Sequence, residues 1–149
     1  MGVASRRRAV GRVKAEDIVG IPLFAALSSD EQDRVASVSR LLHLDVGAVV
    51  VNEGEFAFDF YALTAGAADV VRAGERIATL AAGDVFGEMG VVAPGDGSRP
   101  RRRRNASVVV TVPSEAIAID GSEFRRLTDE IPALRNAIHA TAARRSVPG

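Results

Sequence analysis

The stretch Gly83-Asp84-Val85-Phe86-Gly87-Glu88-Met89-Gly90, followed later by Arg104-Asn105-Ala106-Ser107, is the most informative part of this sequence. A glycine-rich turn that leads into a short helix offers free backbone N–H groups and the positive end of a helix dipole, and both favour a phosphate. The carboxylate of Glu88 would repel a bare phosphate, so it needs another partner such as a sugar hydroxyl. Arg104 supplies a fixed positive charge before the next strand. The pattern therefore predicts a ligand that carries both a phosphate and a ribose.

The order Gly-Asp-x-Phe-Gly-Glu-Met, followed by Arg-x-Ala-Ser at the start of an apolar strand, resembles the phosphate-binding cassette of the cyclic-nucleotide-binding domain. That domain occurs in catabolite-activator-type bacterial regulators, regulatory subunits of protein kinase A and cyclic-nucleotide-gated channels. The resemblance extends from about Ile18 to Arg145. It includes three further segments: Ile21-Pro22-Leu23-Phe24, the helix expected from Ser28 to Arg40, and Gly54-Glu55 with Tyr61-Ala62-Leu63-Thr64-Ala65-Gly66. Each fragment alone is weak, but the combination is specific.

The resemblance implies a role for each residue of the cassette. Gly87 would direct N–H groups at the phosphate, Glu88 would accept a hydrogen bond from the ribose 2′-hydroxyl, and Arg104 would contact the exocyclic phosphate oxygens. The amide of Asn105 suits cAMP or cGMP, so the base preference stays open. The predicted ligand-binding residues are Phe86, Gly87, Glu88, Met89, Arg104, Asn105 and Ala106.

Further residues are predicted to surround this site, and each also has a purely structural interpretation. Val50, Leu63 and Val85 would line the pocket around the sugar and base, or simply belong to the barrel core. The last helix would lie over the purine, with Ile138, His139 or Ala142 nearest as a lid, although His139 is better explained as an exposed helix residue than as a ligand group.

The sequence departs from the family's pattern between the two segments of the cassette. Arg104 stands sixteen positions after Glu88, and the segment 94–100 is polar and rich in Gly and Pro. Long surface loops cost little free energy, so the insertion is compatible with a site. It leaves open which arginine of 101–104 meets the phosphate.

Composition narrows the class of protein. A chain of 149 residues, 47% hydrophobic and 26% charged, is the size of one globular domain with its own core. A formal net charge of zero gives no electrostatic case for nucleic acid or an anionic membrane. The absence of cysteine excludes disulfides, thiolate metal sites and a cysteine nucleophile. No apolar run has the length of a membrane span and the start lacks a signal peptide, so cytoplasm is expected.

The pattern along the chain predicts a mainly β fold: an antiparallel jelly-roll barrel with one N-terminal helix and two C-terminal helices. Residues 1–14 are basic and form a predicted tail or linker before a domain at 15–149. The first helix is expected from Ser29 to Arg40, with Ser29 and Gln32 at capping-box spacing. The last two are expected from Ser122 and from Pro132. Glycines separate the expected strands, which are Leu41–Leu44, Ala48–Val51, Phe60–Ala65, Ala68–Arg72, Ile77–Leu80, Ala106–Val112 and Ala116–Ile119, with a hairpin turn at Ala73-Gly74-Glu75.

The function expected from these observations is a regulatory module that binds cAMP, or alternatively cGMP, without catalysis and without a cofactor. It would signal to a protein partner or a fused effector domain through its terminal helices, and a homodimer through the last helix is an open possibility.

A second hypothesis is a degenerate domain that binds a protein without nucleotide. A jelly-roll metalloenzyme would need clustered histidines, and His43 and His139 are the only two. Arg99 and the run 101–104 lack aromatic neighbours that could stack on bases, so nucleic acid is not expected.

Overall fold

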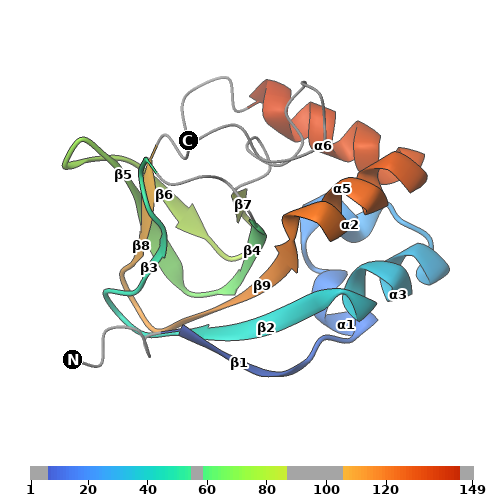
Figure 1. The fold of residues 1–149 in the computed structure, drawn as a ribbon, viewed down its shortest axis with the longest axis horizontal. Helices are drawn as coiled ribbons and strands as arrows, with labels where there is room; N and C mark the ends of the chain where they lie inside the picture. Colours follow the sequence, from blue (N-terminus) through green and yellow to red (C-terminus); the bar gives the residue numbers. More distant parts are fainter. Residues whose placement is uncertain (1–6, 55–58, 87–105, 145–149) are drawn as a thin grey trace.

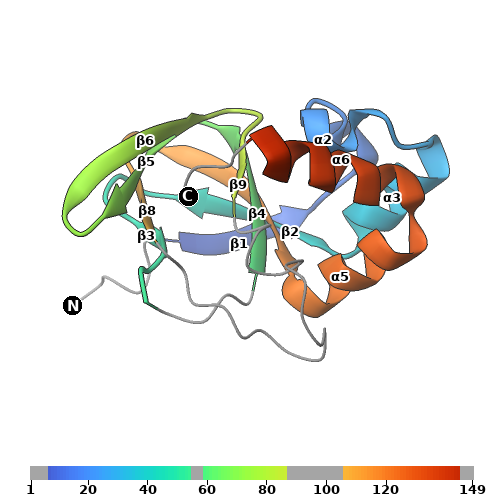
Figure 2. The ribbon, with the colours of Figure 1, turned by 90° about the horizontal axis from the view of Figure 1, so that it is seen from above.

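The computed structural model describes residues 7–54, 59–86 and 106–144 of the chain (Figure 1). Its described strands form two antiparallel sheets, one in the order β1-β2-β9-β4-β7 and the other in the order β3-β8-β5-β6. The two sheets face one another and the helices gather at one end of them, as Figure 2 shows. The predicted jelly-roll barrel with flanking helices is confirmed.

The strands lie close to the predicted segments. They are β1 (Arg7–Arg12), β2 (Ser39–Leu44), β3 (Val49–Val51), β4 (Asp59–Ala65), β5 (Ala67–Arg72), β6 (Glu75–Ala81), β7 (Val85–Phe86), β8 (Ser107–Val110) and β9 (Ser114–Asp120). The strands β1 and β7 were not predicted. The stretch expected to be a loose basic tail contributes β1, which pairs antiparallel with β2 from Arg7 opposite Leu44 to Arg12 opposite Arg40. The domain boundary at residue 14 stays a prediction.

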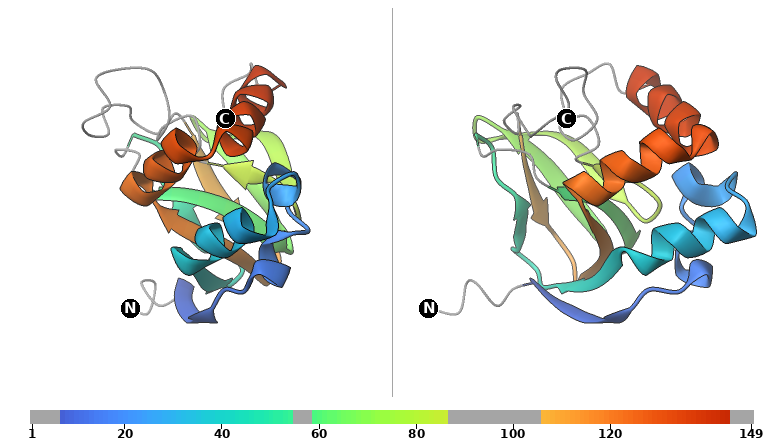
Figure 3. Two further views of the ribbon diagram at one scale, coloured as in Figure 1. Left: turned by 90° about the vertical axis from the view of Figure 1, so that its right-hand side faces the viewer. Right: turned by 45° about the vertical axis from the view of Figure 1, so that its right-hand side comes forward.

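The helices come from both termini and pack together. The described helices are α1 (Ala15–Ile18), α2 (Pro22–Ala25), α3 (Ser29–Ser37), α5 (Gly121–Glu130) and α6 (Pro132–Arg144). The helix α3 lies where the N-terminal helix was predicted, whereas α1 and α2 precede it and were not predicted. Figure 3 shows the N-terminal helices beside α5 and α6 on the same side of the sheets, and α2 contacts α6. No helix within the described ranges is long and apolar enough to cross a membrane.

The helix caps correct two predictions by one or two residues. The N-cap of α3 is Ser28 and not Ser29: the Ser28 N–H donates to Glu31 Oε1 at 2.9 Å, and the Glu31 N–H donates to Ser28 Oγ at 3.2 Å. Ser29 is its first helical residue, and α3 ends at Ser37 instead of Arg40. The helix α5 was expected to begin at Ser122, but its N-cap is Asp120. The Asp120 carboxylate accepts a 2.9 Å hydrogen bond from the Ser122 N–H. Each cap satisfies an N–H group that the first helical turn leaves without a partner.

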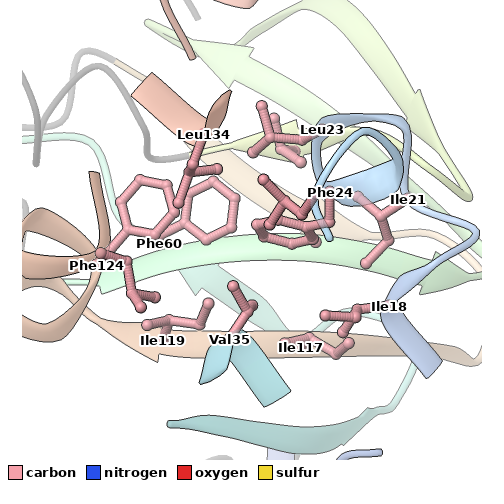
Figure 4. Close-up of a cluster of buried hydrophobic side chains, with 14 of the residues drawn as sticks. Ile18, Ile21, Leu23, Phe24, Val35, Phe60, Ile117, Ile119, Phe124 and Leu134 are labelled. Atoms are coloured by element: carbon pink, nitrogen blue, oxygen red, sulfur yellow. The ribbon is translucent and has the colours of Figure 1, made fainter. Parts of the chain in front are cut away.

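Two hydrophobic cores lie on opposite faces of the five-stranded sheet. The helix-side core joins that sheet to the helices (Figure 4), and its largest members include Ile18, Phe24, Phe60, Ile117, Ile119, Phe124, Leu134 and Ile138. The barrel core lies between the two sheets and includes Leu44, Val50, Tyr61, Leu63, Val70, Phe86, Ala106, Val108, Ala116 and Ala118. Because both faces of β4 and β9 are buried at their centres, residues 60–63 and 116–119 form unbroken apolar runs instead of alternating.

Two connections between strands contain residues with positive φ. Ala73 and Gly74 connect β5 to β6 with φ of 53° and 83°, which is the requirement of a two-residue type I′ hairpin. The predicted turn at Ala73-Gly74 is therefore confirmed. Gly66, with φ of 100°, connects β4 to β5, and a Cβ atom there would lie 2.0 Å from Ser114 Oγ.

Candidate functional site

The first half of the predicted cassette begins in a turn that is fastened to β4. The Gly83 N–H donates to the Leu63 carbonyl at 2.8 Å, and the Leu63 N–H donates to the Asp84 carbonyl at 2.8 Å. The Asp84 carboxylate in turn accepts from the Ala81 N–H at 2.8 Å. Gly83 has φ of 98°, a conformation that glycine adopts without strain. The sequence Gly-Asp thus forms a hydrogen-bonded corner immediately before β7.

The strand β7 then carries its two residues into different cores. Val85 pairs with Ala62 and Phe86 with Tyr61. The ring of Phe86 is 4% exposed and stacks on the ring of Tyr61, with centroids 5.1 Å apart and planes inclined by 16°. Phe86 therefore anchors the end of β7 inside the barrel, directly before Gly87 in the sequence.

Four of the predicted site residues come together in the barrel core. Phe86, Ala106, Val50 and Leu63 lie on or beside different strands, and each is at most 6% exposed. Ala106 stands directly before β8, so both segments of the cassette begin or end at this core. The predicted residues Gly87, Glu88, Met89, Arg104 and Asn105 lie outside the described residues, and their roles stay predictions.

The other predicted residues lie on the helix side of the sheet. Val85 and Ile138 are buried in the helix-side core, at 4% and 1% exposure. His139 is exposed on α6, and Ala142 belongs to the same helix. The roles of Val85 in lining the nucleotide pocket and of Ile138, His139 or Ala142 in covering it stay predictions.

A surface cavity of about 400 Å³ separates the Gly83 corner from the terminal helices. Its wall comes from α2, from the corner and from α6, namely Pro22, Leu23, Gly83, Asp84, Val85, Ala137, Ala140 and Thr141. This cavity lies outside the barrel core. Residues of the corner and of α6 therefore line the same cavity.

The structure adds polar residues that sequence reasoning missed. Tyr61 donates to Asp59 Oδ2 at 3.4 Å, and Arg40 lies 3.5 Å from the same oxygen. Hydrogen bonds from Ser122, first from its hydroxyl and then from its N–H, lower the pKa of Asp120, and the charge of Arg40 lowers it further. The tyrosine lay within a segment already matched to the family. The Arg40 pairing crosses from β2 to β4, and no local pattern signals it.

The fold and the cassette sequence together define a jelly-roll ligand-binding domain with helices at both ends. The family model described as the cyclic nucleotide-binding domain matches residues 41–130. The chain belongs to the cyclic nucleotide-binding domain family.

Curated relatives of two kinds are similar in sequence. The chain is 28% identical over 144 residues to the Pycsar effector protein XpPycTIR of Xanthomonas perforans, covering 97% of this chain and 44% of that protein. It is 26% identical over 118 residues to the cAMP-dependent protein kinase regulatory subunit of Schizosaccharomyces pombe, covering 78% of this chain and 27% of that one. The chain thus spans less than half the length of both relatives.

Solved structures share the fold. The regulatory domain of Toxoplasma gondii protein kinase A with cAMP is 20% identical, with a TM-score of 0.71 over 87% of this chain and 48% of that one. The sensor domain of the transcriptional regulator DNR from Pseudomonas aeruginosa is 24% identical, with a TM-score of 0.71 over 88% and 91%. The regulatory subunit of a cAMP-independent protein kinase A from Trypanosoma brucei is 16% identical, with a TM-score of 0.74 over 86% and 45%.

Proposed function

We propose that this domain binds cAMP at the end of the barrel core where the two cassette segments meet, and that it acts as a regulatory sensor without catalysis. The observation that carries the proposal is the convergence of both segments on one core. Phe86 is fixed by Tyr61 directly before Gly87-Glu88, and Ala106 enters the same core directly after Arg104-Asn105. The described residues that flank the two segments therefore share one core, and this supports a site built from both segments.

The residue types of the cassette suit a cyclic nucleotide. Backbone N–H groups following Gly87 would bind the phosphate, and Glu88 would accept from the ribose hydroxyl. Arg104 would pair with the phosphate oxygens, a charge-assisted contact that favours arginine over lysine. Val50 and Leu63 would supply apolar surface to the sugar and base.

The helix-side core offers a route from the site to the terminal helices. Val85 is the neighbour of Phe86 along β7, yet its side chain lies in the same core as Ile138 of α6. A nucleotide that binds one arrangement of the corner more tightly would therefore favour one position of α6. The ligand can shift the equilibrium between the two arrangements by no more than the difference in its binding free energy for them.

The names of similar proteins support the ligand and the output. The structure from Toxoplasma gondii contains cAMP, and the relative from Schizosaccharomyces pombe is named for dependence on cAMP. Both curated relatives have most of their length outside the matched region. We therefore propose that the output passes to a protein partner or to a fused effector domain.

The test is a calorimetric titration of the purified protein with cAMP, cGMP, cCMP and cUMP, with 5′-AMP as the acyclic control. Arg104→Ala is expected to weaken cAMP binding by about 10- to 100-fold, because it removes a charged hydrogen bond to the phosphate. Glu88→Ala should also weaken it. Arg76→Ala removes an exposed arginine from β6 and serves as the matched control.

Three outcomes would change the proposal. Binding that survives Arg104→Ala but not Arg103→Ala would keep the function and move the phosphate contact by one residue. Tighter binding of another cyclic nucleotide would replace cAMP as the ligand. No binding of any of the four would overturn the proposal in favour of a domain that binds a protein without nucleotide.

A further inference from the structure

Glu53, two residues beyond β3, contacts two segments that are far from it in sequence. Its N–H donates to Ser107 Oγ at 2.8 Å. Its carboxylate Oε1 accepts a 3.0 Å hydrogen bond from the N–H of Ala73 in the β5–β6 turn. One residue therefore connects the end of β3, the start of β8 and the tip of the β5–β6 hairpin, which lie together at one end of the four-stranded sheet (Figure 1).

The position of Ser107 makes this link important for the site. Ser107 is the first residue of β8 and follows Ala106, whose side chain is 3% exposed in the barrel core. The strand β8 lies between β3 and β5 in the sheet. Glu53 thus ties the first residue of β8 to its neighbour β3 and to the turn that ends its other neighbour, β5.

We propose that Glu53 and Ser107 are positioning residues for the nucleotide site: they fix where β8 begins and thereby where the segment ending at Ala106 presents its groups to the phosphate. The inference rests on the proposed function but assigns neither residue a contact with the ligand. A purely local role, in which Glu53 only stabilises the Ala73 turn, would leave nucleotide affinity unchanged.

The two hydrogen bonds can be removed separately. Glu53→Ala removes the acceptor for the Ala73 N–H and keeps the backbone N–H of residue 53. Ser107→Ala removes the acceptor for the backbone N–H of Glu53. The conservative variants Glu53→Gln and Ser107→Thr retain an acceptor oxygen. Thr111→Val is the matched control, because Thr111 Oγ1 donates to the Ala67 carbonyl at 3.2 Å just beyond the opposite end of β8.

The first readout is the dissociation constant for cAMP, measured beside the thermal midpoint of each variant. Since exposed hydrogen bonds contribute modestly, Glu53→Ala and Ser107→Ala should each weaken binding by about three- to tenfold. If the bonds act as one unit, the double variant should lose less than the product of the two single effects. Glu53→Gln, Ser107→Thr and Thr111→Val should bind like the unmodified protein.

The second readout is amide hydrogen exchange without ligand, which separates this inference from the proposed function. Ser107→Ala should accelerate exchange at Ala73, and Glu53→Ala should accelerate exchange at the start of β8. If the unmodified protein binds cAMP and the variants bind it with the same affinity, the positioning role is overturned and the proposed function stands. If the unmodified protein binds no cyclic nucleotide, the proposed function fails. Unchanged amide exchange at Ala73 and at the start of β8 in the variants would overturn the coupling between these two segments.

Discussion

The ring of Phe60 lies flat against the ring of Phe124, with centroids 4.0 Å apart and planes inclined by 7°. Phe60 belongs to β4 and Phe124 to α5, while Phe24 of α2 meets Phe60 edge-on at 6.1 Å. All three side chains are fully buried (Figure 4). One residue of the sheet therefore joins helices from both ends of the chain.

Removing the Phe60 ring should be among the most destabilising single changes in the helix-side core. Phe60→Ala is expected to lower the free energy of unfolding by about 3–5 kcal/mol, because it deletes a buried ring and leaves a cavity. Phe60→Leu retains most of the volume and should lose at most about 1.5 kcal/mol. Urea denaturation of both variants checks this, and similar losses for Leu and Ala would contradict it.

Gly66 and Gly74 provide a matched pair for separating strain from collision. Both have positive φ, but a Cβ at Gly66 meets Ser114 Oγ at 2.0 Å, whereas a Cβ at Gly74 meets nothing within 4 Å. Gly74→Ala should cost about 1–2 kcal/mol of stability from backbone strain. Gly66→Ala should cost about 2–5 kcal/mol because overpacking adds to the strain. Thermal denaturation that finds equal losses would show that Ser114 moves aside freely.

Asp120 should make the stability contributed by the α5 cap depend on pH. Its pKa in the folded protein is lowered from the usual 3.8, chiefly by hydrogen bonds from Ser122. Its charged form therefore adds stability that is present above about pH 4 and is lost as the pH falls through the lowered pKa. Asp120→Ala should cost about 1 kcal/mol at pH 7. The difference between the two proteins should shrink when urea denaturation is repeated at pH 3 and below, and a constant difference would contradict the assignment.

Ala73 is a site where a substitution should stabilise the protein. Alanine adopts its left-handed φ of 53° with strain, whereas Asn-Gly is the preferred pair of a type I′ turn. Ala73→Asn should raise the free energy of unfolding by about 0.5–1 kcal/mol. Ala78→Asn, on exposed β6, is the control and should destabilise because asparagine is disfavoured in strands. The two variants should shift the urea midpoint in opposite directions.

The sequence predicts most strands because glycines mark the turns between them, but it misses elements that depend on distant pairing. The segment Arg7–Arg12 is basic and lacks apolar alternation, so only its pairing with β2 reveals a strand. The strand β7 has two residues, too few for any periodicity. The α3 cap was misplaced because Ser28 and Ser29 are adjacent and both offer a hydroxyl, with Glu31 and Gln32 at matching positions.

The sequence predicts the cassette, but it does not show which core each residue beside the cassette enters. Val85 and Phe86 are adjacent, but one side chain enters the helix-side core and the other the barrel core. Because β4 is buried on both faces, its pattern does not show which residues face the barrel. The contacts of Glu53 with Ala73 and Ser107 span 20 and 54 positions, so they depend entirely on the folded sheet.

The two cores meet along β9, where successive residues alternate between them. Ala116 and Ala118 face the barrel, and Ile117 and Ile119 face the helices. A mutant library at the two alanines would vary the space inside the barrel and keep the surface on which the helices pack. A library at the two isoleucines would vary that packing surface and keep the space inside the barrel. Within four consecutive residues, selection can therefore alter what the barrel accommodates and how the helices rest on it as two separate traits.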